Sequence, residues 1–406
     1  MRRLILMLLM FVAGCAGPRI AEGPQPLPAA RPPVILVSID GFRPDYLGHG
    51  VTPNLDALAA GGVRATAMRP SFPSLTFPNH YTLVTGLRPD HHGVVSNTME
   101  DAAIPGVRFS LSNREATADR RWWDAAEPVW VTAENAGIRT ATMFWPGADA
   151  AIHGVRPAHW LPFDGSVPSG KRVDTLLGWI DGADHPGFAT LYFDTVDHEG
   201  HAAGPGSPPV MAAVADVDAQ VGRLLAGLKA RGVAANIVVV SDHGMAATSP
   251  DRVILLDGIA PAGSFRLVGA GAEAGVEAMP GQEVALAAAL LARHDHVQCW
   301  RKADVPARLA YGRNPRVPAF VCLPDVGWLI FGSAPKEPVT AGGAHGYDNG
   351  APDMAALFIA SGPAFRAGVV LAPFDNVDVY PLLMRLVGVP ARPSDGSIAS
   401  LAKGLR

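Results

Sequence analysis

Short apolar runs alternate with amphipathic stretches along most of the chain. Apolar, β-branched runs of this kind are typical of strands buried on both faces, and they occur at Val34–Ile39, Phe188–Phe193, Asn236–Ser241 and Ala355–Ala360. The apolar residues of Pro209–Arg231 recur every three or four positions, which predicts a helix that begins near Pro209 and stops at Gly232. A second helix is predicted at Gln282–Arg293.

This alternation of strands and helices predicts an α/β domain with a central, mainly parallel sheet. The domain is expected to span residues 33–406. Residues 246–343 are less regular and rich in glycine and proline. They are predicted to hold a small inserted cap subdomain between two pieces of the active site.

The first residues have the pattern of a targeting segment. Arg2 and Arg3 precede the apolar run Leu4–Ala13, which is too short to span a bilayer and predicts a signal peptide of residues 1–14. The run ends next to Cys15, in a Val-Ala-Gly-Cys sequence that resembles a bacterial lipoprotein cleavage box. Lipidated Cys15 and a proline-rich tether, residues 15–32, would then hold the domain at the periplasmic face of a bacterial membrane. The alternative is an ordinary signal peptide and a soluble periplasmic protein.

Composition narrows the range of functions. Hydrophobic residues make up 49% of the chain and charged residues 17%, which is enough for a large core and too apolar for a disordered protein. The formal net charge is −4 and no run of lysine or arginine occurs, so no nucleic-acid polymer is expected as a partner. No obligate protein partner is indicated either. Cys299 and Cys322 either form a disulfide in an exported protein or stay separate buried thiols.

Aspartate and histidine residues gather where the predicted strands end. Asp40 follows one strand and Asp242-His243 follow another, at the edge where open α/β sheets bind ligands. Asp197 and His201 are spaced four residues apart, so one helical turn would place both beside one metal ion. His345 lies in a glycine-rich loop. Alone, Asp40 could cap a turn and His345 could be a surface residue, but together the three Asp and three His suit two zinc ions.

Thr76 is the candidate nucleophile. It lies in the segment PSFPSLTFPNHYTLVTG, residues 70–86, and could open a short helix that carries His80, Tyr81 and Leu83. A hydroxyl at a helix start beside a divalent cation has a lowered pKa and lies near backbone N–H groups that can hold phosphate oxygens. The alternative is a helix-capping threonine.

At these residues the chain resembles the nucleotide pyrophosphatase/phosphodiesterase family of the alkaline phosphatase superfamily. The resemblance extends from about Pro33 to Pro390, and its motifs are residues 40–43, 73–86, 93–99, 196–201, 241–245 and 343–347. It implies an alkaline phosphatase-like fold with helices on both faces of the sheet. The chain lacks the cysteine-rich and nuclease-like modules of multidomain animal members, and together with the lipoprotein box this favours a compact bacterial member.

The resemblance also implies roles for individual residues. Two Zn²⁺ ions per chain are expected, although manganese or cobalt would fit the same donors. One zinc would be held by Asp40, Thr76, Asp242 and His243, and the other by Asp197, His201 and His345. Asn97 would donate to a phosphate oxygen.

The implied reaction is hydrolysis of a phosphodiester or pyrophosphate bond through a covalent threonyl-phosphate intermediate. Nucleoside 5'-monophosphate esters, nucleoside triphosphates and dinucleotides are the expected substrates. Phe77, Tyr192 and Trp160 are candidates to stack on a base, and the last two are also candidates for the core.

Four other functions stay open at this point. A phosphate monoesterase or a choline-lipid phosphodiesterase would use the same metal scaffold. A sulfatase would need a Cys or Ser in a Cys/Ser-x-Pro-x-Arg setting, which the residues after Thr76 do not provide. A catalytically silent, metal-stabilised binding lipoprotein would not need Thr76.

Overall fold

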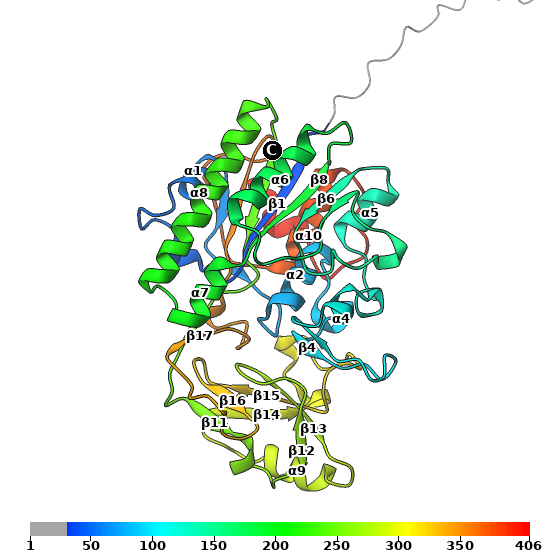
Figure 1. Cartoon of the computed structure of the whole chain (residues 1–406), viewed down its shortest axis with the longest axis vertical. Helices are drawn as coiled ribbons and strands as arrows, with labels where there is room; N and C mark the ends of the chain where they lie inside the picture. The colour runs from blue at the N-terminus through cyan, green and yellow to red at the C-terminus, as the bar shows by residue number, and fades with distance from the viewer. Residues whose placement is uncertain (1–30) are drawn as a thin grey trace, which may run out of the picture. The chain divides into compact units, whose positions relative to one another are not determined.

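The computed structural model describes residues 31–406, in which Pro32–Arg406 form one compact unit (Figure 1). The predicted signal peptide, Cys15 and nearly all of the predicted tether lie outside the described residues. Within the described part of the chain, no helix is both long enough and apolar enough to cross a membrane.

An eight-stranded sheet lies at the centre of this unit, in the order β19-β2-β18-β9-β1-β8-β6-β7. Its strands are β1 (Val34–Ile39), β2 (Val63–Ala65), β6 (Thr140–Met143), β7 (His159–Trp160), β8 (Phe188–Phe193), β9 (Asn236–Val240), β18 (Phe358–Ser361) and β19 (Val369–Leu371). In this sheet β18 runs antiparallel to both of its neighbours, and the other pairings are parallel. The predicted α/β class with a mainly parallel sheet is therefore confirmed.

The side chains of β1 explain why its sequence is apolar throughout. Val34 and Leu36 join one buried hydrophobic cluster, whereas Ile35, Val37 and Ile39 join another. Successive residues of a strand point to opposite faces, so a central strand with helices on both faces must be apolar at every position.

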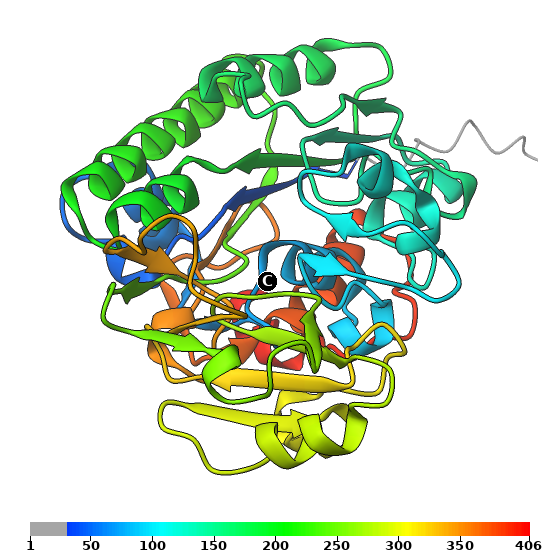
Figure 2. The ribbon, with the colours of Figure 1, turned by 60° about the horizontal axis from the view of Figure 1, so that its bottom comes forward.

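Helices cover both faces of the sheet (Figures 1 and 2). One face packs against α1 (Pro53–Gly61), α6 (Ser169–Asp181) and α8 (Pro208–Ala230). The other packs against α2 (Thr76–Thr85), α5 (Val129–Asn135) and α10 (Val379–Val387). The helix predicted at Pro209–Arg231 is therefore present as α8, one residue earlier at each end.

The fourth predicted strand differs from the structure in its start. β18 begins at Phe358 rather than Ala355, because Pro352–Met354 form a short 3-10 turn and the Ala355 N–H donates to the carbonyl of Pro352. Other short elements surround the central sheet: β3 (Met68–Arg69), α3 (Pro89–His92), β4 (Thr98–Met99), β5 (Phe109–Ser110), α4 (Arg114–Ala118), α7 (Thr195–Ala203) and β20 (Phe374–Asp375).

Residues between β10 (Ala246–Thr248) and β17 (Gly342–Ala344) form a second region, called the insert below. β10 and β17 pair antiparallel, so the two ends of the insert lie side by side. Its antiparallel sheet has the order β12-β13-β15-β14, with β12 (Phe265–Leu267), β13 (Ala274–Ala278), β14 (Val297–Arg301) and β15 (Phe320–Pro324). β11 (Val253–Leu255) pairs with β16 (Leu329–Phe331) beside it. Figures 1 and 2 show these yellow-green to orange strands apart from the central sheet.

The insert has a hydrophobic core of its own, against which α9 (Glu283–Leu290) packs. This helix ends earlier than the predicted Gln282–Arg293. Cys299 and Cys322 lie opposite each other on β14 and β15 and form a disulfide, which decides between the two alternatives left open by the sequence. Whether the insert acts as a cap over the active site stays a prediction.

Candidate active site

The acidic residues picked out in the sequence lie at one edge of the central sheet. Asp40 follows β1, Asp242 follows β9 after one residue, and α7 begins just after β8. These three strands are parallel neighbours, so their carboxyl ends meet at the same edge. Gly41 has a φ of +67°, and a side chain there would press on Asp197. The sheet therefore brings the predicted site residues together from distant parts of the chain.

Asp197, His201 and His345 form the first cluster of potential metal ligands. The Nε2 atoms of the two histidines are 3.1 Å apart, and each lies close to Asp197, at 3.4 Å for His201 and 3.5 Å for His345. The Nδ1 atoms donate to the carbonyls of Gly343 and Ser74, both at 2.9 Å. These bonds leave the Nε2 lone pairs facing a common point, as metal-binding histidines require.

The second cluster contains Asp40, Asp197 and His243, and Asp242 lies beside it. His243 Nδ1 donates to the carbonyl of Gly244 at 2.9 Å, so its Nε2 also faces inward. This Nε2 is 2.9 Å from Asp242 Oδ2, 3.5 Å from Asp40 Oδ1 and 3.3 Å from the hydroxyl oxygen of Thr76. All four ligands that the sequence predicts for one zinc are therefore adjacent.

The electrostatics of the two clusters fit divalent cations. Asp40 Oδ1, Asp197 Oδ1 and Asp242 Oδ2 are buried and have no hydrogen-bond donor among residues 31–406. Burial, reinforced by the charges of Asp242 and Asp197, raises the pKa of Asp40 well above its usual value. Burial and the neighbouring histidines hold the pKa of His345 well below its usual value, which keeps it neutral as a ligand must be. Buried carboxylates without partners are costly, and a metal ion would supply the missing partner.

Thr76 is the first residue of α2, and only 6% of it is exposed. The residue before it, Leu75, occupies the capping position, and the Thr76 hydroxyl does not cap the helix. The capping alternative for Thr76 is therefore wrong. The backbone N–H of Thr76 has no acceptor among the described residues, so it can hold a phosphate oxygen.

Asn97 lies beside this helix start, but its contact corrects one expectation. Its Oδ1 accepts a hydrogen bond of 2.9 Å from the N–H of Phe77. The Phe77 N–H, one of the backbone groups near the helix start that were expected to hold phosphate oxygens, is therefore occupied. The same bond fixes the Asn97 amide and leaves its Nδ2 as a free donor.

A cavity of about 390 Å³ adjoins Thr76 and is called the aromatic cavity below. Its wall contains Phe77, Tyr192, Trp145 and Phe163, together with Asp197 and His201. The Tyr192 hydroxyl also donates to Asp40 Oδ2 at 2.6 Å, so Tyr192 orients the Asp40 carboxylate as well as lining the cavity.

Trp160 does not line the aromatic cavity, and its predicted role as a base-stacking residue finds no place in this structure. It lies on β7, the outermost strand of the central sheet, with the Arg156 guanidinium over its ring. Trp145 and Phe163 line the cavity instead. Trp145 comes two residues after β6, and its position at the end of that strand could have indicated that it lies near the site.

His80 is a further site residue that the sequence did not single out. It is fully buried, and it forms a third group of potential ligands with Asp40 and Asp242. Its Nδ1 donates to the carbonyl of Thr76 at 2.8 Å, and its Nε2 accepts from the Ser38 hydroxyl at 2.8 Å. His80 lies one helical turn after Thr76, and this spacing could have indicated that it belongs to the site.

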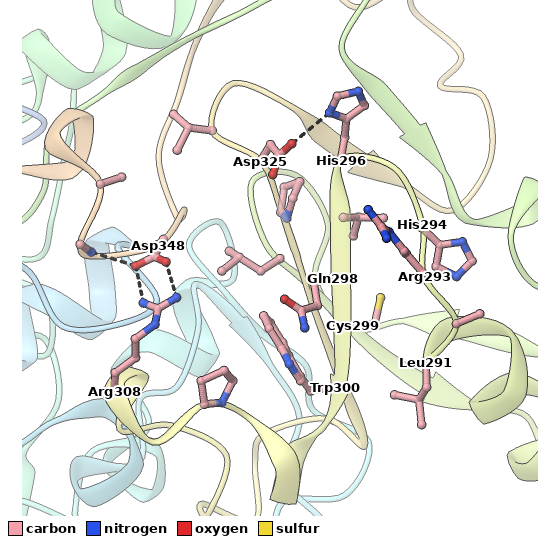
Figure 3. A pocket seen from close by; sticks show the side chains of 18 residues that line it. Leu291, Arg293, His294, His296, Gln298, Cys299, Trp300, Arg308, Asp325 and Asp348 are labelled. Carbon is pink, nitrogen blue, oxygen red and sulfur yellow. Dashed lines mark hydrogen bonds and ion pairs between the residues drawn. The ribbon is translucent and has the colours of Figure 1, made fainter.

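A larger hollow of about 1170 Å³ lies on the insert (Figure 3). Several of its charged groups already have partners: Arg308 forms two hydrogen bonds with Asp348, at 2.8 and 2.6 Å, and His296 pairs with Asp325 at 3.0 Å. None of the predicted site residues lines it. The chemistry therefore gathers at the sheet edge and not in the larger hollow.

Comparison with known proteins points the same way as the geometry. A family model described as type I phosphodiesterase / nucleotide pyrophosphatase matches residues 34–348. An uncharacterized pyrophosphatase/phosphodiesterase of Schizosaccharomyces pombe is 40% identical over 90% of this chain and 78% of its own length. Ectonucleotide pyrophosphatase/phosphodiesterase family member 3 of mouse is 38% identical over 91% of this chain, which spans only 44% of that protein.

Solved structures give the same result. The structure of murine ectonucleotide pyrophosphatase / phosphodiesterase 5, an inactive variant in complex with AMP, has a TM-score of 0.88 and 34% sequence identity. The matched region covers 92% of this chain and 100% of the murine chain. These relatives are eukaryotic, so the bacterial origin stays a prediction.

Proposed function

This chain belongs to the type I phosphodiesterase / nucleotide pyrophosphatase family of metal-dependent hydrolases, and on that premise we propose that it hydrolyses nucleotide phosphodiester and pyrophosphate bonds with Thr76 as the nucleophile. The observation that carries the proposal is the convergence of Thr76, three histidine Nε2 atoms and three aspartates that each have a buried, unpartnered oxygen among residues 31–406, at one edge of the sheet. A purely structural metal site would not need a hydroxyl at the start of a helix.

We assign two zinc ions to this edge. Asp40, Thr76, Asp242 and His243 would hold one, and Asp197, His201 and His345 the other. The inward-facing Nε2 atoms and the unpartnered carboxylate oxygens support this assignment, and zinc suits such a mixed donor set. When bound, the two ions lower the pKa of the Thr76 hydroxyl and neutralise charge that develops on the phosphoryl group.

The residues of the chain then divide the reaction between them. Thr76 Oγ1 loses its proton and bonds to phosphorus while the bond from phosphorus to the leaving oxygen breaks and that oxygen takes up a proton, which gives a threonyl-phosphate. Water next attacks phosphorus, and the nucleoside monophosphate and the Thr76 hydroxyl are released. The Thr76 N–H and the Asn97 Nδ2 donate to the nonbridging oxygens, where negative charge increases in the transition state.

The aromatic cavity is the proposed place for the nucleoside. Phe77 follows the nucleophile directly, and Phe77, Trp145 and Tyr192 all border the cavity. Aromatic rings stack on any base, so several nucleotides would be accepted. The AMP complex of the murine relative supports a nucleotide as the substrate.

The test compares three chromogenic esters with the metal-loaded enzyme, with and without a chelator: p-nitrophenyl thymidine 5'-monophosphate, bis-p-nitrophenyl phosphate and p-nitrophenyl phosphate. We expect chelator-sensitive hydrolysis with the thymidine ester as the best substrate. A preference for p-nitrophenyl phosphate would contradict the proposal and indicate a monoesterase. Metal analysis of the same preparation distinguishes zinc from manganese or cobalt.

From the sequence alone we also propose a bacterial lipoprotein, with residues 1–14 removed and Cys15 lipidated at the periplasmic face of the membrane. Expression in a bacterium with labelled palmitate should label the wild type and not the Cys15→Ala variant, which should move to the soluble fraction. Label-free wild-type protein would favour the soluble periplasmic alternative.

A further inference from the structure

A second cavity, of about 250 Å³, reaches the same metal cluster from the side of the insert. It contains Asn97, His201 and His345, and it shares His201 with the aromatic cavity. Thr76 borders the aromatic cavity and not this one. The Asp197-His201-His345 cluster therefore adjoins two separate spaces, one aromatic and one bordered by residues of the insert.

The insert contributes residues 269–273, Gly-Ala-Gly-Ala-Glu, which connect β12 to β13. Hydrogen bonds in both directions between Gly271 and Ile330, at 2.9 and 2.8 Å, hold this loop. A side chain at Gly346, next to His345, would lie 3.4 Å from Ala272 and 3.0 Å from Leu75. The loop is therefore packed closely against the segments that carry His345 and Thr76.

Glu273 is the unusual residue of this loop. Only 5% of it is exposed, it lines the cavity, and its carboxylate has no hydrogen-bond or ion-pair partner among residues 31–406. Burial alone raises the pKa of Glu273 to about 7. A buried carboxylate without a partner costs folding free energy, so its presence at the wall of a cavity beside the active site points to a ligand.

The other residues that line the cavity would not attract a phosphate group. No lysine or arginine is among them, and the two histidines are already directed at the proposed metal site. The remaining wall consists of small, apolar or uncharged polar residues, including Leu75, Ser96 and Leu329. A diphosphate in this space would lie near Glu273 without a positively charged side chain to balance it.

We propose, on the basis of the function proposed above, that this cavity receives the leaving group and that Glu273 selects groups which carry hydroxyl or ammonium donors and no further phosphate. In an in-line displacement the leaving group departs opposite to Thr76 Oγ1, on the side of the Asp197-His201-His345 cluster. The aromatic cavity takes the nucleoside, and Glu273 accepts hydrogen bonds from the alcohol that is released. The preferred substrates are thus esters of a nucleoside 5'-monophosphate with a small polyhydroxylated or amino alcohol, not nucleoside triphosphates.

The test measures kcat/KM for two adenosine 5'-phosphates that differ only in the leaving group, the glyceryl ester of AMP and ATP. We expect the wild-type enzyme to prefer the glyceryl ester about tenfold or more, and Glu273→Gln to reduce the ratio of the two values about tenfold, the effect of one hydrogen bond to a charged group. Glu273→Ala should act in the same direction. A comparison of the choline ester of AMP with its glyceryl ester shows whether the enzyme recognises an ammonium group or a hydroxyl group.

Glu283→Gln is the matched control, because Glu283 lies on α9 of the same insert and, among residues 31–406, its carboxylate accepts a hydrogen bond only from the N–H of Gly281 near that helix start. It should keep the wild-type ratio. A wild-type preference for ATP, or an unchanged ratio in Glu273→Gln with normal zinc content, would overturn the inference while leaving the proposed function intact. Failure of the wild type to hydrolyse p-nitrophenyl thymidine 5'-monophosphate would instead remove the proposed function and the inference with it.

Discussion

The edge of the central sheet and the insert contribute to the site in opposite ways. The sheet edge gathers Asp40, Asp197 and Asp242 from the segments that follow three parallel strands, with three inward-facing histidine nitrogens. The insert has its own antiparallel sheet, core and disulfide, and it brings one loop with Glu273 to the site. The sheet edge thus holds the groups for the chemistry, which are set by the topology of the fold, whereas the insert borders the space where substrates would differ. Changes to the nucleophile or to the proposed metal ligands at the sheet edge should strongly reduce turnover of every substrate, and changes in the insert should alter only selectivity and stability.

The largest effect is expected for Thr76→Ala. Loss of the nucleophile should lower kcat about 10⁴-fold for every ester, because residues that form a covalent intermediate contribute effects of this size. Zinc content and AMP binding should stay close to wild type, because Asp40, Asp242 and His243 remain. Steady-state assays with p-nitrophenyl thymidine 5'-monophosphate measure kcat. Thr76→Ser serves as a control that retains a hydroxyl. Wild-type turnover by the alanine variant would exclude Thr76 as the nucleophile.

Asp197→Asn should have the next largest effect, because Asp197 belongs to both groups of ligands. We expect zinc content to fall and kcat/KM to drop about 10³-fold, more than the tenfold to hundredfold that is typical when an outer residue of a metal site is lost. Metal analysis after dialysis and the chromogenic assay are the measurements. The control is Asp216→Asn, an exposed change on α8 away from the site. Two zinc ions per chain in Asp197→Asn would remove Asp197 from the ligand set.

The same contrast explains what could be predicted from the sequence. The apolar runs predicted β1, β8 and β9. Parallel strands place the residues that follow them at one edge of the sheet, whatever the conformation of the loops, so the positions of Asp40 and Asp242 could be predicted from the sequence. Asp197 and His201 lie on one helical turn, which is also a local feature. His345 was a weak candidate by itself and was assigned to a particular zinc only through the resemblance, since nothing near it in the chain indicates that its loop folds back onto Ser74.

The residues that were missed depend on packing between distant segments. Glu273 could be recognised only from its burial, and burial is not visible in the sequence around it. Trp160 and Trp145 are both tryptophans near strand ends, but β7 lies at the outer edge of the sheet whereas the segment after β6 reaches the site. To predict which tryptophan lines the cavity, one would need the order of the strands in the sheet. The alternation of strands and helices along the chain does not specify that order.

Glu273→Gln should change stability in a pH-dependent way. The folded-state pKa of Glu273 is raised from 4.5 to about 7, so its contribution to stability is complete below about pH 4.5 and is lost as the pH rises through 7. The charged carboxylate should then cost up to about 3 kcal/mol at pH 8, since each pKa unit corresponds to about 1.4 kcal/mol. Denaturant unfolding should show the glutamine variant more stable than wild type at pH 8 and equal to it at pH 5. Glu283→Gln should show no such dependence, and an equal difference at both pH values would argue against a raised pKa.

The smallest effect is expected for His80, where the sheet edge has a residue that grouping by distance alone would count as a metal ligand. Both of its nitrogens are already used, Nδ1 on the carbonyl of Thr76 and Nε2 on the Ser38 hydroxyl, so we expect it to position the start of α2 and not to bind metal. His80→Ala should therefore lower kcat about tenfold with little change in KM or zinc content, as for other outer residues of metal sites. His80→Asn should recover part of the rate, because an asparagine amide can still donate to the carbonyl of Thr76. If His80→Ala lost zinc in proportion to activity, His80 would be a ligand. The sheet edge would then hold four histidine donors, and the division of ligands between the two proposed ions would have to be redrawn around Asp40, Asp242 and His80.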